Sequence, residues 1–162
     1  MHKKYNIGIC LTNPKDTYSG GRYFSITMAE SLASAGHNVS YITNLIPIFY
    51  ADFSYLKTHD TIGQYITADF IKNMPKKLDF LYVFPGTHAE YFYKNVIDYA
   101  QLVGCHVVLI NFETPNWFNS LSPDKKNSKL WLGWEKVASA SSIILSIAKE
   151  GNRYAKNYYN KT

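Results

Sequence analysis

The chain has few cysteines, few charged residues and no long apolar run, and each shortage excludes a class of protein. Its 162 residues include only two cysteines, Cys10 and Cys105, each in or beside an apolar strand-like run. Their spacing matches neither a zinc site nor a disulfide framework, so we expect buried, reduced thiols. Charged residues make up 18% of the sequence and hydrophobic residues 46%, which is typical of a folded chain and not of a disordered one.

No segment approaches the length of a membrane span, and none has the form of a signal peptide. The N-terminal MHKKYNIGICL places basic residues before an apolar run, but Thr12 and Asn13 interrupt that run and no small-residue cleavage pattern follows. We therefore expect a cytoplasmic protein. The run LIPIFYADFSYLK, residues 45–57, is a weak candidate for contact with a membrane surface, which would place the protein at the inner membrane face.

The charge balance is mildly positive. The sequence has 17 Lys and Arg against 12 Asp and Glu, a formal net charge of +5, which favours anionic partners such as a nucleotide diphosphate or an acidic lipid surface. It contains no long Lys/Arg run and no aromatic-basic ribonucleoprotein motif, so nucleic acid is not an expected partner. Aromatic residues are abundant, with 14 Tyr, 9 Phe and 3 Trp, and we expect some of them to line a cleft or contact surface.

Short apolar runs alternate with helical patterns, which predicts one α/β domain spanning residues 1–162. Strands are predicted at 5–11, 38–43, 79–85, 106–112 and 141–147, with a short edge strand at 64–68. Helices are predicted at about 22–35, 88–103, 130–140 and 149–159, the first ending at Gly36. Right-handed crossovers would arrange these elements as a Rossmann-like open parallel sheet with helices on both faces.

Helical spacing groups the apolar side chains of three of these helices. One face of the first helix carries Phe24, Met28, Leu32 and Ala35, and one side of the second carries Phe92, Val96, Tyr99 and Val103. Trp131 and Trp134 have helical spacing in the third helix and are expected in the core. The strand at 106–112 is continuous in apolar residues, so we expect both of its faces to be covered.

In sheets of this type, ligands bind beyond the carboxyl ends of the strands, where the strand order reverses. This rule selects the loop after the first predicted strand, and Gly20 and Gly21 lie at the end of that loop. They come directly before a helix whose first N–H groups carry partial positive charge. They either let the backbone approach a phosphate closely or simply allow a tight entry into the helix. Arg22 is either a phosphate or carboxylate contact or a surface residue. Neither a Gly-x-Gly-x-x-Gly turn after the first strand nor a P-loop is present, so NAD binding by the usual geometry is not expected.

The segment SGGRYFSITMAESLASAGHNVSYIT, residues 19–43, resembles the opening of family 4 glycosyltransferases and their GT-B relatives. The residues that carry this resemblance are Gly20, Gly21, Ala29, Leu32, Ala33, Gly36, His37 and Val39. Residues 79–92 and 135–151 agree with later family segments in order and spacing, so the resemblance touches most of the chain outside 45–77. We expect His37 to serve the packing of the helix on the strand.

The resemblance implies the N-terminal, acceptor-side half of a GT-B glycosyltransferase, which moves a sugar from a nucleotide-sugar donor to a glycan or lipid-linked acceptor. The C-terminal donor-binding domain would be missing from this chain, so we expect residues 1–162 alone to be inactive. Neither a metal nor a cofactor is expected, because helix dipoles and basic side chains can neutralise the leaving diphosphate. The alternative is a stand-alone Rossmann-like or flavodoxin-like module that binds a small anion.

Several residues near the predicted strand ends are candidates for the site. Many family members have a histidine after the strand at 106–112, where this chain has Phe112 and Glu113. Glu113 either acts as a base or orients an acceptor hydroxyl, or it is a solvated loop carboxylate. His88 either reaches the cleft or only begins a helix. Trp117 and Phe118, in the polar loop that follows, are candidates to lie against a sugar or lipid.

Overall fold

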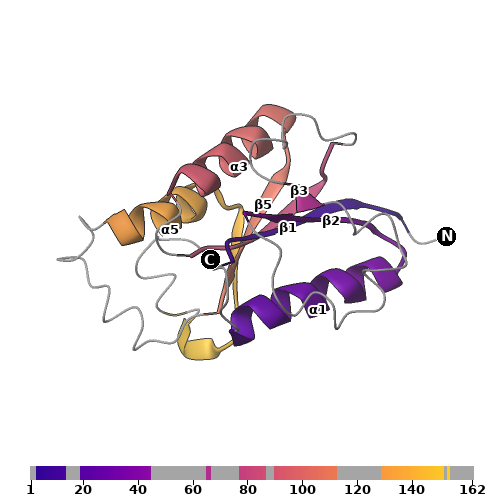
Figure 1. Cartoon of the computed structure of the whole chain (residues 1–162), viewed down its shortest axis with the longest axis horizontal. Coiled ribbons are helices and arrows are strands. Elements are labelled where there is room, and N and C mark those ends of the chain that lie inside the picture. Colours follow the sequence, from indigo (N-terminus) through magenta and orange to yellow (C-terminus); the bar gives the residue numbers. More distant parts are fainter. Residues whose placement is uncertain are drawn as a thin grey trace.

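One open sheet of parallel strands organises the molecule, which we describe from a computed structural model (Figure 1). The structure describes residues 3–13, 19–44, 65–66, 77–86, 90–112, 129–151 and 153. In these residues six strands have the order β3-β2-β1-β4-β5-β6, and all neighbouring pairs are parallel. The strands are β1 (Asn6–Leu11), β2 (Asn38–Thr43), β3 (Tyr65–Ile66), β4 (Phe80–Phe84), β5 (His106–Asn111) and β6 (Ile143–Ser146).

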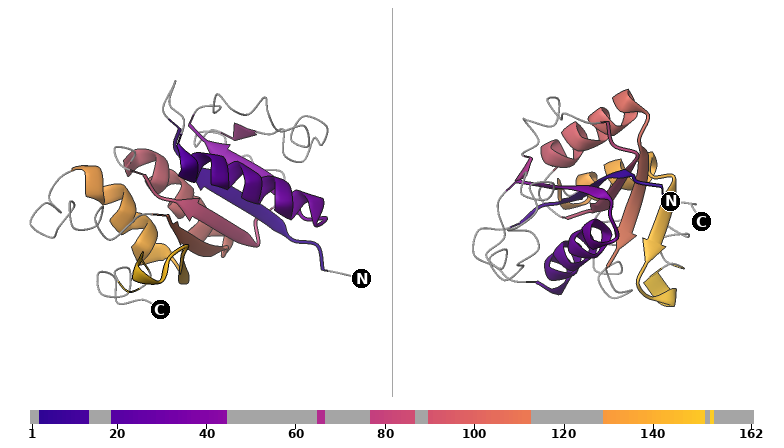
Figure 2. Two further views of the ribbon diagram at one scale, coloured as in Figure 1. Left: turned by 90° about the horizontal axis from the view of Figure 1, so that it is seen from below. Right: turned by 90° about the vertical axis from the view of Figure 1, so that its right-hand side faces the viewer.

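Helices cover both faces of this sheet, which confirms the predicted Rossmann-like α/β architecture. Helix α1 (Gly20–Ser34) lies on one face, and α3 (Glu90–Val103) and α5 (Lys129–Ala140) lie together on the other (Figure 2). Alternate residues of β5 enter two separate cores: Val107 and Leu109 pack on the α3 and α5 side, and Val108 and Ile110 on the α1 side. The prediction that this strand is covered on both faces is therefore confirmed.

Helix α1 begins and ends at residues suited to those positions. The side chain of Ser19 caps the helix by accepting a hydrogen bond from the backbone N–H of Arg22 at 3.3 Å. After the helix, Gly36 has a φ of +93°, a left-handed conformation that glycine adopts without steric cost. The predicted stop at Gly36 is confirmed, and the chain enters β2 two residues later.

The buried face of α1 differs from the face that the apolar spacing marks. Phe24 is 40% exposed and Ala35 lies on the surface, while Met28 and Leu32 pack only at the edge of the core. The side chains that face the sheet are Ser25, Ile26, Ala29 and Ala33. Small residues let the helix approach the sheet closely, and Ser25 is tolerated there because its hydroxyl hydrogen-bonds the backbone oxygen of Arg22 and the hydroxyl of Tyr41.

Other predictions about the core have mixed outcomes. On α3, Val96 and Tyr99 are buried as expected, Phe92 and Val103 are half-buried against the core, and Tyr93, Ile97 and Ala100 complete the buried face. Trp134 is buried as predicted, whereas the side chain of Trp131 lies outside the described residues.

Both cysteines are free thiols; Cys10 is buried as expected, whereas Cys105 is only half-buried. Burial raises the pKa of both thiols, to about 12 for Cys105. The predicted edge strand at 64–68 is present as β3, which pairs with the end of β2.

The predictions for the last helix and for the run at 45–57 concern segments that the structure describes in part or not at all. Residues 149–151 and 153 of the predicted last helix are helical, and the rest of that helix and the run at 45–57 lie outside the described residues. Among the described helices, none has both the length and the apolar character needed to cross a membrane.

Candidate functional site

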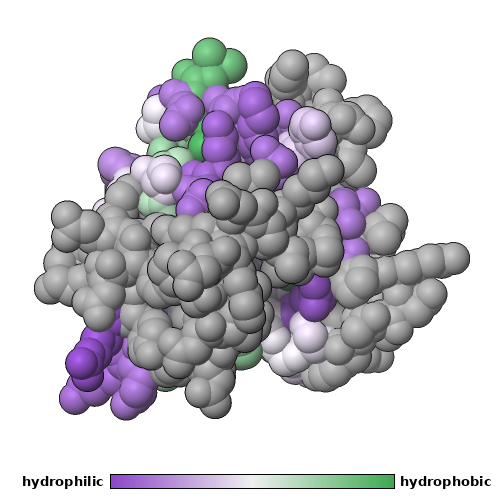
Figure 3. Space-filling view, turned by 90° about the vertical axis from the view of Figure 1, so that its left-hand side faces the viewer, coloured by the Kyte–Doolittle hydropathy of each residue, from purple (hydrophilic) through white to green (hydrophobic). Residues whose placement is uncertain are grey.

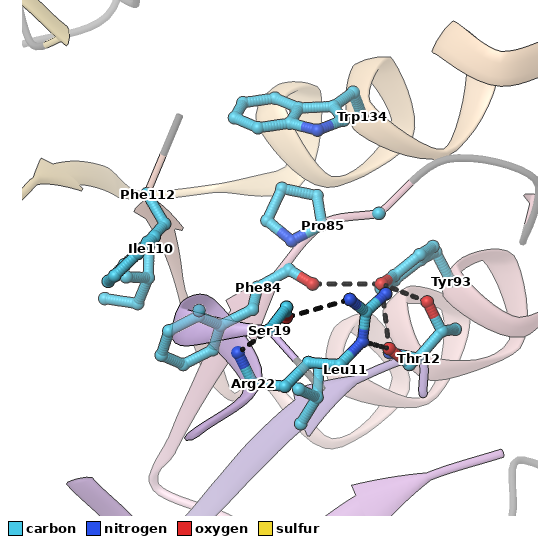
Figure 4. A pocket seen from close by; sticks show the side chains of 12 residues that line it. Leu11, Thr12, Ser19, Arg22, Phe84, Pro85, Tyr93, Ile110, Phe112 and Trp134 are labelled. Atoms are coloured by element: carbon cyan, nitrogen blue, oxygen red, sulfur yellow. Dashed lines mark hydrogen bonds between the residues drawn. The ribbon is translucent and has the colours of Figure 1, made fainter. Parts of the chain in front are cut away.

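A pocket lies at the point where the strand order reverses. From β1 the chain adds β2 and β3 on one side and then returns to place β4 on the other side of β1. At the carboxyl ends of β1, β4 and β5 the structure has a pocket of about 370 Å³ (Figure 4). The pocket is lined by Leu11, Thr12, Ser19, Gly21, Arg22, Phe84, Pro85, Gly86, Tyr93, Ile110, Phe112 and Trp134. This is where ligands bind in open α/β sheets.

Arg22 is the cation of this pocket. Its Nε donates to the backbone oxygen of Thr12 at 3.0 Å, and its Nη1 donates to the side-chain oxygen of Ser19 at 2.9 Å. A guanidinium has five N–H donors, so these two bonds orient the group and leave donors for a ligand. The ion pair found between described residues joins Lys94 and Asp98 on α3, and no described carboxylate pairs with Arg22. The guanidinium therefore gives the described lining a positive charge.

The first turn of α1 adds to this charge. Its N–H groups carry partial positive charge, and none of the residues in that turn is acidic. Gly20 and Gly21 are the first two residues of α1 instead of preceding it as predicted, because Ser19 caps the helix one residue earlier. Their surroundings differ. A Cβ on Gly21 would lie 3.3 Å from the ring of Phe112, whereas a Cβ on Gly20 would have nothing within 4 Å. Gly21 thus lets the Phe112 ring lie against the helix, and the backbone at Gly20 faces open space.

An apolar wall faces the polar part of the pocket. It is formed by Phe84, Pro85, Ile110, Phe112 and Trp134 (Figure 4). Phe112 and Phe84 also lie beside the ring of Phe24, with centroid distances of 5.5 and 6.2 Å. The described lining thus combines one positively charged group with an aromatic and aliphatic surface, an arrangement that fits a ligand with an anionic head and an uncharged body.

Tyr93 of α3 connects the strand ends beneath the pocket. Its buried hydroxyl donates to the backbone oxygen of Phe84 at 2.9 Å and accepts from the backbone N–H of Thr12 at 3.2 Å. The side-chain oxygen of Thr12 lies at 3.2 Å as well. Burial raises the pKa of Tyr93 well above its ordinary value, so this hydroxyl stays protonated at neutral pH. Helical spacing of apolar residues predicted a buried position for its neighbour Phe92 and did not identify Tyr93.

A second polar cluster closes the neighbouring strand ends without lining the pocket. The backbone N–H of Asn13 donates to the side chain of Asn44 at 2.6 Å, and the Asn13 side chain donates to Thr43 at 2.7 Å. The Asn44 side chain returns a bond to the Asn13 backbone at 3.1 Å. These bonds join the ends of β1 and β2 and explain why polar side chains are buried there.

The structure brings together part of the predicted site. Gly20, Gly21 and Arg22 lie at the pocket or directly beside it, as does Phe112. His88, Glu113, Trp117 and Phe118 lie outside the described residues, so their roles stay predictions.

His37 packs its ring on Tyr5 with a centroid distance of 5.6 Å and accepts a hydrogen bond from the Tyr5 backbone, a contact between the residues that directly precede β1 and β2. A role in packing the helix on the strand stays a prediction. The described lining contains no carboxylate and no imidazole. Within the described parts of the chain, no three His, Cys, Asp or Glu residues gather as metal ligands would. On the face shown in Figure 3, the described residues are mainly hydrophilic. Exposed apolar side chains elsewhere include Ile143, Leu145 and Ile147, on and just after β6.

Comparisons with protein-family models and with curated protein sequences find no match to this chain. The resemblance to GT-B glycosyltransferases therefore stays a prediction from the residues quoted above.

Proposed function

We propose that this chain is the acceptor-side domain of a GT-B glycosyltransferase, and that Arg22 contacts a phosphate group of the nucleotide-sugar donor. The observation that carries the proposal is the pocket at the strand-order reversal, in which Arg22 and the start of α1 face an otherwise uncharged described lining. The resemblance of residues 19–43 to the family opening supports the same position.

The chemistry of the pocket suits a phosphate. An arginine fork forms two parallel hydrogen bonds with phosphate oxygens, and hydrogen bonds to charged groups contribute about 1.5–3 kcal/mol each. The start of a helix adds backbone N–H donors and a favourable dipole. The apolar wall would receive the uncharged part of a donor or acceptor, and Phe112 is the member of that wall that lies against the helix start.

One observation favours the alternative, a binding module for a small anion. The described lining supplies a cation and apolar surface but no group suited to proton transfer near neutral pH, because the Tyr93 hydroxyl has a strongly raised pKa. Such a lining can bind an anion without transforming it. On this alternative, the chain holds its ligand with no further domain.

Both functions require that the pocket bind an anion through Arg22. Calorimetric titration with inorganic phosphate, a nucleoside diphosphate and sugar nucleotides tests this requirement. We expect R22Q to raise the Kd of the diphosphate by about ten- to a hundredfold, and R22K to retain part of the affinity. K94Q, which removes a positive charge from the exposed side of α3, is the matched control and should leave the Kd unchanged. Equal binding by R22Q and the wild-type protein would refute the role of Arg22.

Sugar transfer separates the two functions. If the chain is an acceptor-side domain, residues 1–162 show no turnover with any sugar nucleotide, and activity appears when a donor-binding domain is supplied. Tight, saturable binding of a small anion together with the absence of transfer in any longer protein would favour the binding module. Turnover by the purified chain alone would contradict both.

A further inference from the structure

We propose that Tyr93 is the positioning residue of the pocket: its hydroxyl fixes Thr12, and Thr12 in turn orients the guanidinium of Arg22. The part of this proposal that concerns anion binding rests on the proposed function, whereas the orientation of Arg22 in the free protein does not.

The hydroxyl of Tyr93 is fully engaged within the protein. A tyrosine hydroxyl offers one proton and accepts two hydrogen bonds. Its proton goes to the backbone oxygen of Phe84, and both the N–H and the side chain of Thr12 lie at hydrogen-bond distance from its oxygen. The hydroxyl has no proton left for a ligand. Its effect on the pocket must therefore pass through the groups that it holds.

Thr12 passes that effect to Arg22. Leu11 is the last residue of β1 that pairs with β2 and β4, so Thr12 lies just beyond the sheet's own hydrogen bonds. The Thr12 N–H is held by Tyr93 and its carbonyl oxygen by Nε of Arg22 at 3.0 Å. A rotation of this residue would move the carbonyl and with it the partner that fixes Nε. Asn44 holds the Asn13 N–H of the same peptide group, and Ser19 accepts from Nη1 of Arg22. The hydroxyl of Tyr93, from a different helix, fixes the other side of Thr12 and so shares in setting the direction of the guanidinium.

Close packing holds the Tyr93 ring in place. A Cβ on Gly86 would lie 2.9 Å from the Thr12 side-chain oxygen and 3.2 Å from the Tyr93 hydroxyl. A Cβ on Gly133 of α5 would lie 3.1 Å from Cδ2 of the ring. The absence of side chains at both glycines lets β4 and α5 close around Tyr93. Its hydroxyl therefore has a fixed position from which it can orient Thr12.

Tyr99 offers a matched control for Tyr93. It lies on the same helix, is largely buried, and its hydroxyl hydrogen-bonds the backbone of Leu78, just before β4. Y93F and Y99F each remove one hydroxyl that joins α3 to the sheet, at opposite ends of β4. A loss of general stability affects both variants, whereas a change at Arg22 is expected only in Y93F.

The arginine Nε–H signals in a nitrogen-edited NMR spectrum of the free protein provide the decisive readout. The chain has only two arginines, Arg22 and Arg153, and the Arg22 signal is assigned by its loss in R22K. We expect a resolved, slowly exchanging Arg22 signal in the wild-type protein and in Y99F. In Y93F it should move to the position of a solvated arginine. An unchanged signal in Y93F, or an equal change in Y99F, would overturn the proposal.

Titration with inorganic phosphate and a nucleoside diphosphate measures whether the orientation of Arg22 affects anion binding. We expect Y93F to raise the Kd about tenfold, as one misdirected charge-assisted hydrogen bond would, and Y99F to change it less than twofold. If the wild-type protein binds neither anion, the proposed function fails while the Arg22 signal still decides the positioning role. Should Y93F not fold, G86A replaces it, because its added Cβ would lie 2.9 Å from the Thr12 side-chain oxygen and 3.2 Å from the Tyr93 hydroxyl and so displaces that contact. An Arg22 signal unchanged in G86A then overturns the proposal.

Discussion

Gly20 and Gly21 are consecutive residues in the first turn of α1, yet an added methyl group would meet very different surroundings at the two positions. At Gly20 it would have nothing within 4 Å, and at Gly21 it would lie 3.3 Å from Cδ1 of Phe112. Alanine substitution therefore separates the general cost of glycine in a helix from the specific contact with the pocket wall.

G20A is expected to stabilise the protein, and G21A is not. Glycine in a helix is less favourable than alanine by about 0.5–1 kcal/mol, so G20A should raise the free energy of unfolding by roughly that amount. G21A makes the same gain, but the Phe112 ring must move by a few tenths of an ångström, and overpacking costs about 1–3 kcal/mol. We expect G21A to be neutral or destabilising by up to about 2 kcal/mol.

Thermal unfolding followed by circular dichroism measures both effects. In a domain of this size 1 kcal/mol corresponds to about 2–4 °C, so G20A should raise Tm by roughly 1–4 °C. Equal stabilisation by G21A would refute the contact between Phe112 and the helix start. Phosphate titration adds a second test. Weaker binding by a stabilised G20A would show that a ligand fills the open space at Gly20.

Three further substitutions test individual features. S19A should lower the free energy of unfolding by about 1 kcal/mol in urea melts by removing the cap of α1, and an unchanged midpoint would contradict the capping bond to Arg22. Burial raises the pKa of Cys105 from 9.0 to about 12, so its contribution to stability is complete below pH 9 and is lost as the pH rises toward 12. C105A should therefore lose less stability than the wild-type protein between pH 8 and 11, and parallel pH profiles would exclude this titration. G36A should lower stability by about 1 kcal/mol or more because φ is +93° with no side chain nearby, and an unchanged Tm would contradict that backbone conformation.

The sequence predicts the sheet well and the packing of its helices less well. Strand β2 has the predicted bounds, and β3 lies at the predicted edge. Apolar runs bounded by turns are a local signal, so one sequence suffices to find them. The buried face of α1 depends on how closely the helix approaches the sheet, which favours Ala29 and Ala33 over the larger Phe24. The distance between helix and sheet depends on the residues of both elements, so the spacing of residues within the helix alone does not predict it.

The site shows the same division between local and tertiary signals. The rule for strand-order reversal selects the loop before α1, and Arg22 lies at the pocket as its position beside the glycines suggests. Tyr93 could not be found in this way, because its partners Thr12 and Phe84 are chosen by the fold. A tyrosine in the first turn of a helix that follows a strand end is a weak signal on its own.

The pairing of β1 with β4 has a consequence for how the pocket forms. Thr12 and Tyr93 are 81 positions apart, so the site closes only after two distant parts of the chain have met. Forming such non-local contacts is slow, because the entropy of closing the intervening chain is lost before they stabilise anything. An anion bound there would oppose unfolding of the whole sheet, by about 2.7 kcal/mol at a hundredfold excess over its Kd. Fragments that end before β4 would contain Arg22 but no binding site.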